Sequence, residues 1–524
     1  MDKRILATAV VLLVLSLLSL GEGARILGLV PLGQSHNIMG VAYMKTLAAA
    51  GHDVTVLTPT AQKNPPKNYR EILLTGMLES QAKNEQNLFK FKGSGPVSAG
   101  IMMMFLYKLF PEEICKFVLE HPNVIKLLES GEKFDLVLAE SFVAESLYGF
   151  AQHFNAPLIT YSAFGNCMWT NDLVGTPAPS SHVAHFSLTL TDRMTYWERM
   201  FNSAWTLLDR AYYSLFYLPE QKKLYEATFP NPQLSFDQQM KNVSLVFLNQ
   251  HFSISSPRPM ATNMIEVGGV HIDDPKPLPK DLQTYIDEAK DGVIYFCMGS
   301  NLKSKDMPVE KRDAFLKAFS KLKQRVLWKF EDDTIPNQPP NLKIQSWMPQ
   351  NDILAHPNVK VFITHGGLLG STESIFHGKP MIGIPIFGDQ MMNVQKAVQA
   401  GYSVFLDYDD ISEQTVSAAI NEVLNNPAYT QKVQQISQRF RDKPMTPRQT
   451  VTYWVDYVLR HHGAPHLKSP AVDLSFWQYH SLDVLATFLA IFIVILVLEV
   501  MIVKAILRKI FRKKSKADSK KKRS

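Results

Sequence analysis

Cysteine is scarce in this sequence, because only Cys115, Cys167 and Cys297 occur among 524 residues. Three cysteines allow at most one disulfide bridge, and no Cys-x-x-Cys pair suggests zinc binding or redox chemistry. The sequence therefore excludes a disulfide-stabilised scaffold, and buried or unreactive thiols are the better interpretation of all three.

Excess positive charge is absent from most of the chain, although the formal net charge is +7. From Lys504 to the end there are eleven Lys or Arg residues against one acid, Asp518. Of the 55 basic and 48 acidic residues, 44 and 47 remain before this tail, a charge of −3. The basicity belongs to a tail and not to a groove, so nucleic-acid binding loses its main argument.

Long apolar runs occur only near the two ends. The first follows Asp2-Lys3-Arg4 and precedes small residues, which is typical of a secretory signal peptide over residues 1–23 rather than a retained anchor. The second, within 482–503, is apolar from Val484 to Val503 apart from Glu499, and twenty helical residues rise roughly 30 Å, enough for a bilayer core. The basic tail 504–524 then predicts a single-pass protein with its bulk in the lumen.

Between these runs, buried strand patterns such as RILGLVPL, FDLVLAE, GVIYFCM and VKVFITH alternate with helical patterns. This alternation predicts an α/β fold with parallel sheets. The Pro-rich segment DDPKPLPKDL has linker composition. We therefore expect two doubly wound, Rossmann-like domains facing a cleft, an N-terminal domain over residues 24–272 and a C-terminal domain over 273–462. A juxtamembrane segment, residues 463–481, follows them.

Two aromatic- and Met-rich stretches interrupt the first half, GIMMMFLYKLFPEEICKFVL and MTYWERMFNSAWTLLDRAYYSLFYLP. Core packing is the better interpretation for most of their residues. Their adaptable apolar side chains also suit an acceptor pocket or a surface resting on a membrane.

Polar residues follow four strands of the second half, where parallel strands present ligand sites at their carboxyl ends. The four segments are Gly299-Ser300-Asn301, Trp347-Met348-Pro349-Gln350, His365-Gly366-Gly367 and Asp389-Gln390. Gly366 and Gly367 let the backbone approach a ligand, and the helix opening near Gly370-Ser371 offers free N–H groups to a phosphate. A lone tryptophan or histidine is more often core, but four such segments at one sheet edge indicate a binding site.

Each of these side chains has a chemical role available. His365 can donate a hydrogen bond to a diphosphate, and Glu373 can accept both hydroxyls of a ribose. Trp347 suits stacking on a flat base, with Gln350 beside it. Asp389 and Gln390 offer the mixed acceptors and donors that sugar hydroxyls need.

Residues 347–395, WMPQNDILAHPNVKVFITHGGLLGSTESIFHGKPMIGIPIFGDQMMNVQ, closely resemble the signature of the UDP-glycosyltransferase family. The resemblance extends over FCMGSN, VGGVHI, the Pro-Arg-Pro around Arg258, WQYHSLDV and the basic tail, and it fits the animal membrane-bound branch, with insect-like details. It implies the two-domain GT-B fold, with a UDP-sugar as co-substrate and neither cofactor nor metal. Many relatives have Asn at the position of Leu369, so that diphosphate contact must come here from backbone or Ser371.

The resemblance also assigns the chemistry. His36, in the loop after the first strand, corresponds to the catalytic base, and Glu140 to the acid that orients it, where vertebrate relatives usually have Asp. The donor site would comprise Ser300, Trp347, Gln350, His365, Gly367, Ser371, Glu373, Asp389 and Gln390, with Arg258 as a further candidate sugar contact.

We therefore expect inverting transfer of a hexose, from UDP-glucose rather than UDP-glucuronate, to a small lipophilic acceptor in detoxification or in hormone or metabolite conjugation. A non-catalytic membrane-anchored carrier or receptor for lipophilic ligands is the alternative, and a polymer-forming or protein-modifying transferase is a third. The expected location is the endoplasmic-reticulum membrane, with a dilysine-like Lys521-Lys522 in the cytosolic tail and a glycosylation sequon at lumenal Asn242. A homo-oligomer is compatible with the resemblance.

Overall fold

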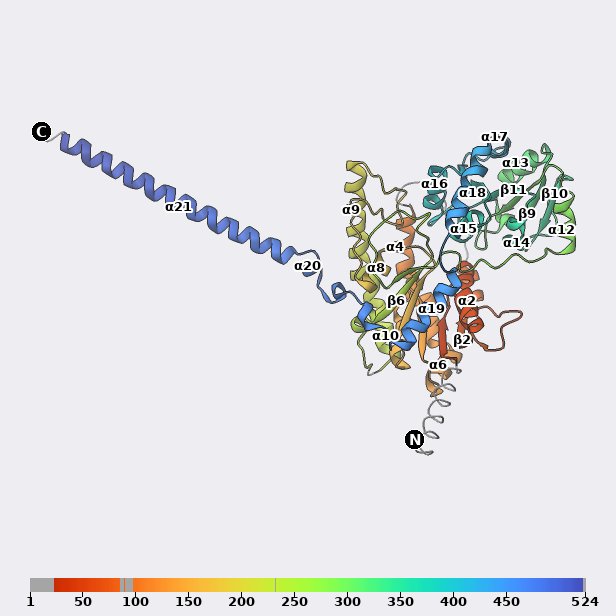
Figure 1. Ribbon diagram of the computed structural model, residues 1–524, viewed down its shortest axis with the longest axis horizontal. Coiled ribbons are helices and arrows are strands. Elements are labelled where there is room, and N and C mark those ends of the chain that lie inside the picture. The colour runs from red at the N-terminus through yellow and green to blue at the C-terminus, as the bar shows by residue number, and fades with distance from the viewer. Residues whose placement is uncertain (1–22, 85–88, 90–97, 231, 522–524) are drawn as a thin grey trace, which may run out of the picture. The chain divides into compact units, whose positions relative to one another are not determined.

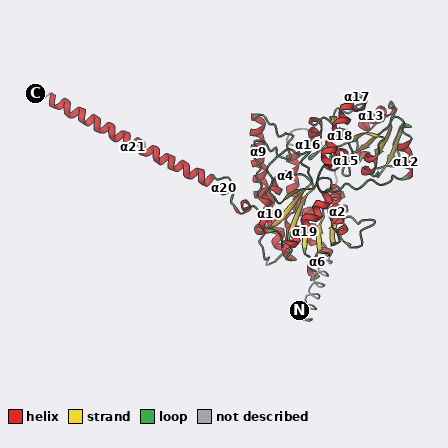
Figure 2. Ribbon diagram, viewed as in Figure 1, coloured by secondary structure: helices red, strands yellow, loops and turns green. Residues whose placement is uncertain are grey.

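The computed structural model describes residues 23–84, 89, 98–230 and 232–521. Most of the expected signal peptide and the last three residues, including Lys522, lie outside the described residues. The chain forms two compact units, one extending to Lys468 and the other from Ser469 to the C-terminus. In the first unit the strands form two separate groups, each flanked by helices (Figure 2).

The first sheet has seven parallel strands among the described residues, in the order β3-β2-β1-β4-β5-β6-β7. Strand β1 pairs with both β2 and β4, so the direction of winding reverses there, as in a doubly wound sheet. The strands are β1 (Arg25–Leu29), β2 (Asp53–Thr58), β3 (Tyr69–Leu73), β4 (Leu136–Glu140), β5 (Leu158–Ser162), β6 (Val243–Leu248) and β7 (Met264–Glu266).

The second sheet repeats this design with six parallel strands in the order β10-β9-β8-β11-β12-β13. Here β8 pairs with both β9 and β11, so the reversal lies between β8 and β11. The strands are β8 (Val293–Cys297), β9 (Arg325–Lys329), β10 (Leu342–Gln345), β11 (Val359–Thr364), β12 (Met381–Gly383) and β13 (Ser403–Phe405).

Helices connect the strands of the first sheet, and two of them continue as π-helices. The elements are α2 (Gln34–Ala49), α3 (Met77–Asn84), α4 (Ser98–Phe110), η2 (Pro111–Lys116, π), α5 (Phe117–Glu120), α6 (Pro122–Glu129), η3 (Glu145–Tyr148), α7 (Gly149–His153), α8 (Met168–Val174), α9 (Tyr196–Tyr212), η4 (Tyr213–Tyr217, π), α10 (Leu218–Thr228) and α11 (Phe236–Met240).

The second sheet has shorter connections. Its elements are α12 (Lys280–Asp287), η5 (Ser304–Asp306), α13 (Val309–Ser320), α14 (Gln350–Ala355), α15 (Leu368–Phe376), α16 (Gln390–Gln399), α17 (Glu413–Asn425) and α18 (Pro427–Arg441). The segment ends with α19 (Pro447–Arg460) and η6 (Pro465–Leu467).

Helix α19 packs on the first sheet, although it lies within the range 273–462 expected to form the second domain. Its residues Val451, Val455 and Val458 recur at helical spacing, so they form one apolar stripe. This stripe is buried in the same core cluster as Ile26 of β1 and Tyr43 of α2. The hydrophobic effect therefore brings the end of the unit back to its beginning.

The second unit contains η7 (Pro470–Asp473), α20 (Phe476–Tyr479) and the continuous helix α21 (Leu482–Lys521), seen in Figure 1. Residues 482–512 of α21 are long and apolar enough to cross a membrane. In the first unit, Cys115, Cys167 and Cys297 are buried free thiols, as expected from the sequence.

Candidate active site

The predicted base and its acid meet at the winding reversal of the first sheet. Strands β1 and β4 are neighbours, so the start of α2 lies next to the end of β4. As a result, Nδ1 of His36 is 2.5 Å from Oε1 of Glu140. The imidazole stacks on Phe142 with ring centres 5.0 Å apart, and the edge of Phe164 lies at 5.4 Å. The sequence-predicted pair is thus held in one orientation within an aromatic setting.

Burial and charge act in opposite directions on His36. Burial lowers the pKa of the imidazole, whereas the charge and hydrogen bond of Glu140 and the charge of Asp389 raise it, and the net pKa lies above the ordinary 6.5. The carboxyl side chain of Glu140 is only 1% exposed, against 17% for His36. Glu140 therefore supports the ring from behind, and His36 is the member that reaches solvent.

A cavity of about 1880 Å³ is lined by both halves of the first unit. His36 lines it from the first half. From the second half it is lined by predicted donor residues: Ser300, Trp347, Gln350, His365, Gly367, Glu373, Asp389 and Gln390. The structure thus brings together the base and nearly all of the predicted donor site.

Two glycines make room for His365 at the reversal of the second sheet. A Cβ atom at Gly299 would lie 2.4 Å from Cε1 of His365, and one at Gly367 would lie 2.4 Å from its Nε2. Gly299 also has φ +87°, a conformation that favours glycine. Burial, followed by the charge of Lys329, lowers the pKa of His365 to about 4. The ring is therefore a neutral donor near pH 7.

Helix α15 begins at Leu368, slightly earlier than the start near Gly370-Ser371 expected from sequence. Leu368, Leu369 and Gly370 line the cavity, so the free backbone N–H groups of the first turn are available to an anion. Ser371 is not among the lining residues, and its buried Oγ has no hydrogen-bond partner in the described chain. Backbone, rather than Ser371, is what this helix offers to a diphosphate.

Glu373 and Gln350 form the polar pair next to this helix end. The Gln350 amide donates to Oε2 of Glu373 at 2.7 Å. Burial raises the pKa of Glu373, the hydrogen bond from Gln350 lowers it and the charge of Asp352 raises it, with a net pKa of about 7. Trp347 lines the same cavity with 69% of its surface exposed, so its ring face is available for stacking.

Asp389 and Gln390 stand at the start of α16 and line the cavity, where the charge of Asp389 acts on His36. Asn393 donates to Oδ2 of Asp389 at 2.7 Å. Burial raises the pKa of Asp389, while Asn393 and the nearby His36 lower it. The amide oxygen of Gln390 accepts the backbone N–H groups of Ile386 at 2.9 Å and Phe387 at 3.1 Å. Its amide nitrogen is therefore the end that can serve a ligand.

Lys329 is a cavity residue that sequence reasoning missed. Its Nζ donates to the carbonyl of Gly299 at 3.1 Å and to Oε1 of Glu331 at 2.6 Å. This cation lies beside His365, where it can offset the charge of a phosphate. The signal was a lysine at the end of the apolar strand RVLWK, where burial of a charge is costly without a function or a partner.

The Met-rich stretch of the first half supplies the apolar wall of the cavity. Helix α4 contributes Met102, Met103 and Leu106, and Phe186 faces the cavity from a loop. The second stretch behaves differently, because α9 and η4 leave Trp197 and Phe216 exposed to 68% and 63%. The pocket interpretation therefore fits α4, and core packing does not describe the outer face of α9.

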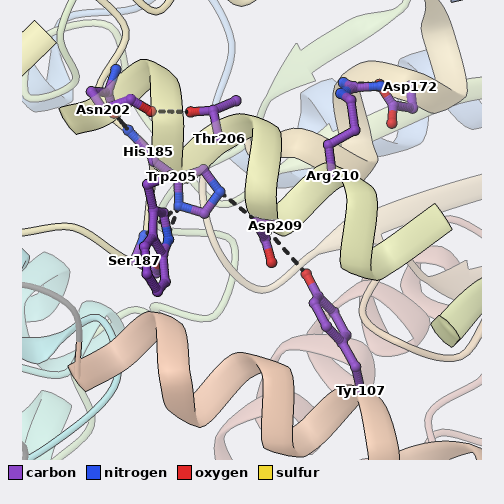
Figure 3. A network of polar contacts seen from close by, with 9 residues as sticks. All are labelled: Tyr107, Asp172, His185, Ser187, Asn202, Trp205, Thr206, Asp209 and Arg210. Atoms are coloured by element: carbon purple, nitrogen blue, oxygen red, sulfur yellow. Dashed lines mark hydrogen bonds and ion pairs between the residues drawn. The ribbon is translucent and has the colours of Figure 1, made fainter. Parts of the chain in front are cut away.

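A buried polar network fixes this wall from behind (Figure 3). Nε2 of His185 is 3.0 Å from Oδ2 of Asp209, and these side chains are 4% and 2% exposed. Oγ of Ser187 lies 2.9 Å from Nδ1 of His185 and accepts the indole N–H of Trp205 at 3.2 Å. Since Ser187 lines the cavity, α9 holds the loop that shapes the apolar lobe.

Two predicted positions lie away from the cavity. The guanidinium of Arg258 donates to the backbone carbonyl of Asn166 at 3.0 Å, and Arg258 is not among the lining residues. Asn242 is exposed immediately before β6, where a glycan would meet solvent.

Comparisons with known proteins agree with this geometry. The family model described as UDP-glucoronosyl and UDP-glucosyl transferase matches residues 25–517. Two proteins of Dactylopius coccus, "UDP-glycosyltransferase UGT5" and "UDP-glucosyltransferase 2", are 37% and 36% identical, each covering 90% of this chain and 90% and 91% of their own lengths. "UDP-glucuronosyltransferase 2B9" of Macaca fascicularis is 30% identical over 87% of this chain and 88% of its own.

Among solved structures, CalG4, the calicheamicin glycosyltransferase, matches with a TM-score of 0.55 at 15% identity, covering 84% of this chain and 99% of that chain. The two facing sheets are thus the GT-B fold. Fold and site together define a sugar-nucleotide-dependent transferase. The chain belongs to the UDP-glycosyltransferase family.

Proposed function

We propose that this UDP-sugar glycosyltransferase with a C-terminal membrane helix transfers a hexose, with inversion, to a hydroxyl group of a small lipophilic acceptor, with His36 as the general base. The observation that carries this proposal is the His36–Glu140 pair, 2.5 Å apart, on a cavity whose other wall holds Glu373, Asp389 and Gln390. The apolar lobe beside α4 suits the acceptor.

In the proposed reaction the acceptor oxygen forms a bond to the anomeric carbon while the bond from that carbon to the diphosphate oxygen breaks. Nε2 of His36 takes the hydroxyl proton, and Glu140 stabilises the resulting imidazolium. The leaving UDP carries the negative charge, which the first turn of α15, His365 and Lys329 can stabilise. Attack on the face opposite the leaving group inverts the anomeric centre.

UDP-glucose is the donor we favour over UDP-glucuronate. The more similar relatives include one named a UDP-glucosyltransferase, whereas the named glucuronosyltransferase is less similar. Arg258, the sequence candidate for pairing with a sugar carboxylate, does not line the cavity. A neutral sugar needs only the hydrogen bonds that Asp389 and Gln390 offer.

Microsomes containing the full chain, incubated with radiolabelled UDP-glucose or UDP-glucuronate and a panel of phenols and steroids, test the proposal. We expect glucoside formation with at least one lipophilic acceptor and release of UDP in equal amount. Acceptor binding without sugar transfer from any UDP-sugar would favour the carrier alternative. Transfer of glucuronate alone would overturn the donor assignment.

We also propose residence in the endoplasmic-reticulum membrane with the catalytic unit in the lumen. The exposed Asn242 sequon provides a reporter, because only a lumenal site receives a glycan. A glycosidase-sensitive mass shift that Asn242→Gln removes would place this unit in the lumen, although lack of a shift would leave topology to protease protection. Replacing Lys521 and Lys522 by Ser should let the glycan acquire later processing, and unchanged processing would contradict dilysine retrieval.

A further inference from the structure

His271 is an unpaired buried histidine on the wall of the cavity. It lies in the segment between β7 and α12 that connects the two sheets, and its side chain is only 1% exposed. Neither ring nitrogen makes a hydrogen bond of good geometry within the described residues, where only the backbone of Leu369 comes close enough to act on the ring, yet the residue lines the cavity. An imidazole buried without partners is costly, so such a group at a cavity points to a ligand-bound state that satisfies it.

The nearest carboxylate is that of Glu373. Nε2 of His271 is 3.6 Å from Oε1 of Glu373, just beyond hydrogen-bonding distance. The other carboxylate oxygen, Oε2, already accepts from Gln350 at 2.7 Å. Glu373 therefore has one oxygen fixed and one oxygen facing an unpaired imidazole.

Charge at His271 is set mainly by burial. The net pKa of the imidazole is about 4, because burial and the charge of Arg448 lower it more than the backbone of Leu369 and the charge of Asp273 raise it. A neutral imidazole has one N–H donor and one acceptor nitrogen. With the proton on Nε2, the ring can donate to Glu373 at neutral pH without bringing a second charge into the cavity.

We propose that His271 is a positioning residue of the nucleotide site, which donates from Nε2 to Oε1 of Glu373 and so aligns this carboxylate with the ribose hydroxyls. The proposal rests on the ribose-binding role proposed for Glu373. A shift of a few tenths of an ångström closes the distance from 3.6 Å to hydrogen-bonding range. Because His271 belongs to the segment joining the two sheets, ribose binding would also order that connection.

Binding of UDP and of 2′-deoxy-UDP to the detergent-solubilised full chain, measured by calorimetry, tests this role. If the carboxylate grips the ribose, the wild type should bind UDP about tenfold more tightly than 2′-deoxy-UDP, the effect of one hydrogen bond to a charged group. His271→Ala should lose most of this preference by weakening UDP more than 2′-deoxy-UDP, which keeps only the 3′-hydroxyl contact to Glu373. His271→Gln, whose amide nitrogen can replace Nε2–H, should restore much of it.

His251→Ala is the matched control, because His251 is also a buried histidine but does not line the cavity. It should leave the preference for UDP unchanged. Equal weakening of both nucleotides by His271→Ala, or an unchanged preference in a His271 variant that binds UDP, would overturn the proposal. If the wild type itself does not distinguish the nucleotides, the role of Glu373 falls as well, whereas the sugar-transfer assay of the proposed function stands independently.

Discussion

The two sheets place their functional groups in the same way but surround them differently. In each sheet the site lies at the winding reversal, between β1 and β4 or between β8 and β11. In the second sheet, each connection between consecutive strands holds at most one α-helix, whereas the first sheet is interrupted by the long excursions 74–135 and 163–242. We propose that groups close to strand ends hold the UDP-sugar, whereas the excursions build the acceptor lobe. The first sheet would then supply the base and the acceptor shape, and the second sheet the donor site.

Replacing His36, the proposed base on the first sheet, should give the largest effect on the rate of sugar transfer. His36→Ala should slow transfer by ~10²–10⁴-fold, the usual contribution of a general base. Affinity for UDP should stay nearly unchanged, because the donor residues lie on the other sheet. Initial rates and calorimetric titration of the same preparation measure both quantities. Turnover close to that of the wild type would remove His36 from the mechanism.

The buried network around His185 and Asp209 should contribute to the free energy of unfolding. Asp209→Ala leaves His185 buried without its partner, which should lower the free energy of unfolding by about 3 kcal/mol. Asp172→Ala is the control, because it removes the α8 partner of Arg210, a neighbour of Asp209 on α9, and so breaks a more exposed pair, where about 0–1 kcal/mol is expected. Urea unfolding followed by tryptophan fluorescence compares the two. Similar losses in both variants would mean that burial of the network does not matter.

Donor residues should separate sugar recognition from nucleotide recognition. Asp389→Ala should weaken intact UDP-sugar roughly tenfold while changing affinity for UDP little, since the proposed contact is to the sugar. Trp347→Ala should weaken both ligands, because stacking involves the base. Competition binding with UDP and UDP-glucose measures the difference. Equal losses for both ligands at Asp389 would move this residue out of the sugar site.

The smallest effect is a shift of pH dependence. The base must be unprotonated, so the raised pKa of His36 places the rising limb of kcat/KM above pH 6.5. In Glu140→Gln, burial still lowers this pKa and the carboxylate charge that raises it is gone, so the limb should move to lower pH with reduced turnover. Glu140→Asp keeps the charge and should retain a limb above that of the Gln variant. An unmoved limb in Glu140→Gln would show that another group titrates.

Sequence analysis predicted the long buried strands, because apolar runs such as GVIYFCM and VKVFITH carry a local signal. It did not identify β3, β7 or β13, which are strands of three to five residues stabilised by pairing with a neighbour rather than by their own composition. All three missed strands are edge strands, which form hydrogen bonds with only one neighbouring strand.

Most of the predicted donor residues occur within one stretch at strand ends, and this is why the sequence could indicate that they line one cavity. His271 illustrates what escaped prediction: it is separated from Glu373 by about a hundred residues, and only the packed linker brings the two together. The predicted roles of Arg258 and Ser371 stay predictions. The guanidinium of Arg258 donates to the backbone carbonyl of Asn166, and Ser371 is buried, which the sequence did not indicate.

Helix α19 gives the molecule a second covalent connection between its halves. The chain leaves the first sheet after β7 and returns to it at Pro447, so we propose that the donor half is an insertion within the acceptor half rather than a C-terminal appendage. Two covalent connections restrict rotation of one half against the other more than one connection does. They favour an opening motion of the two halves about a single axis. An excised segment ending before Pro447 should fold around the second sheet alone. In contrast, any truncation that removes α19 exposes the apolar side chains of Ile26 and Tyr43, and the resulting apolar surface should promote aggregation.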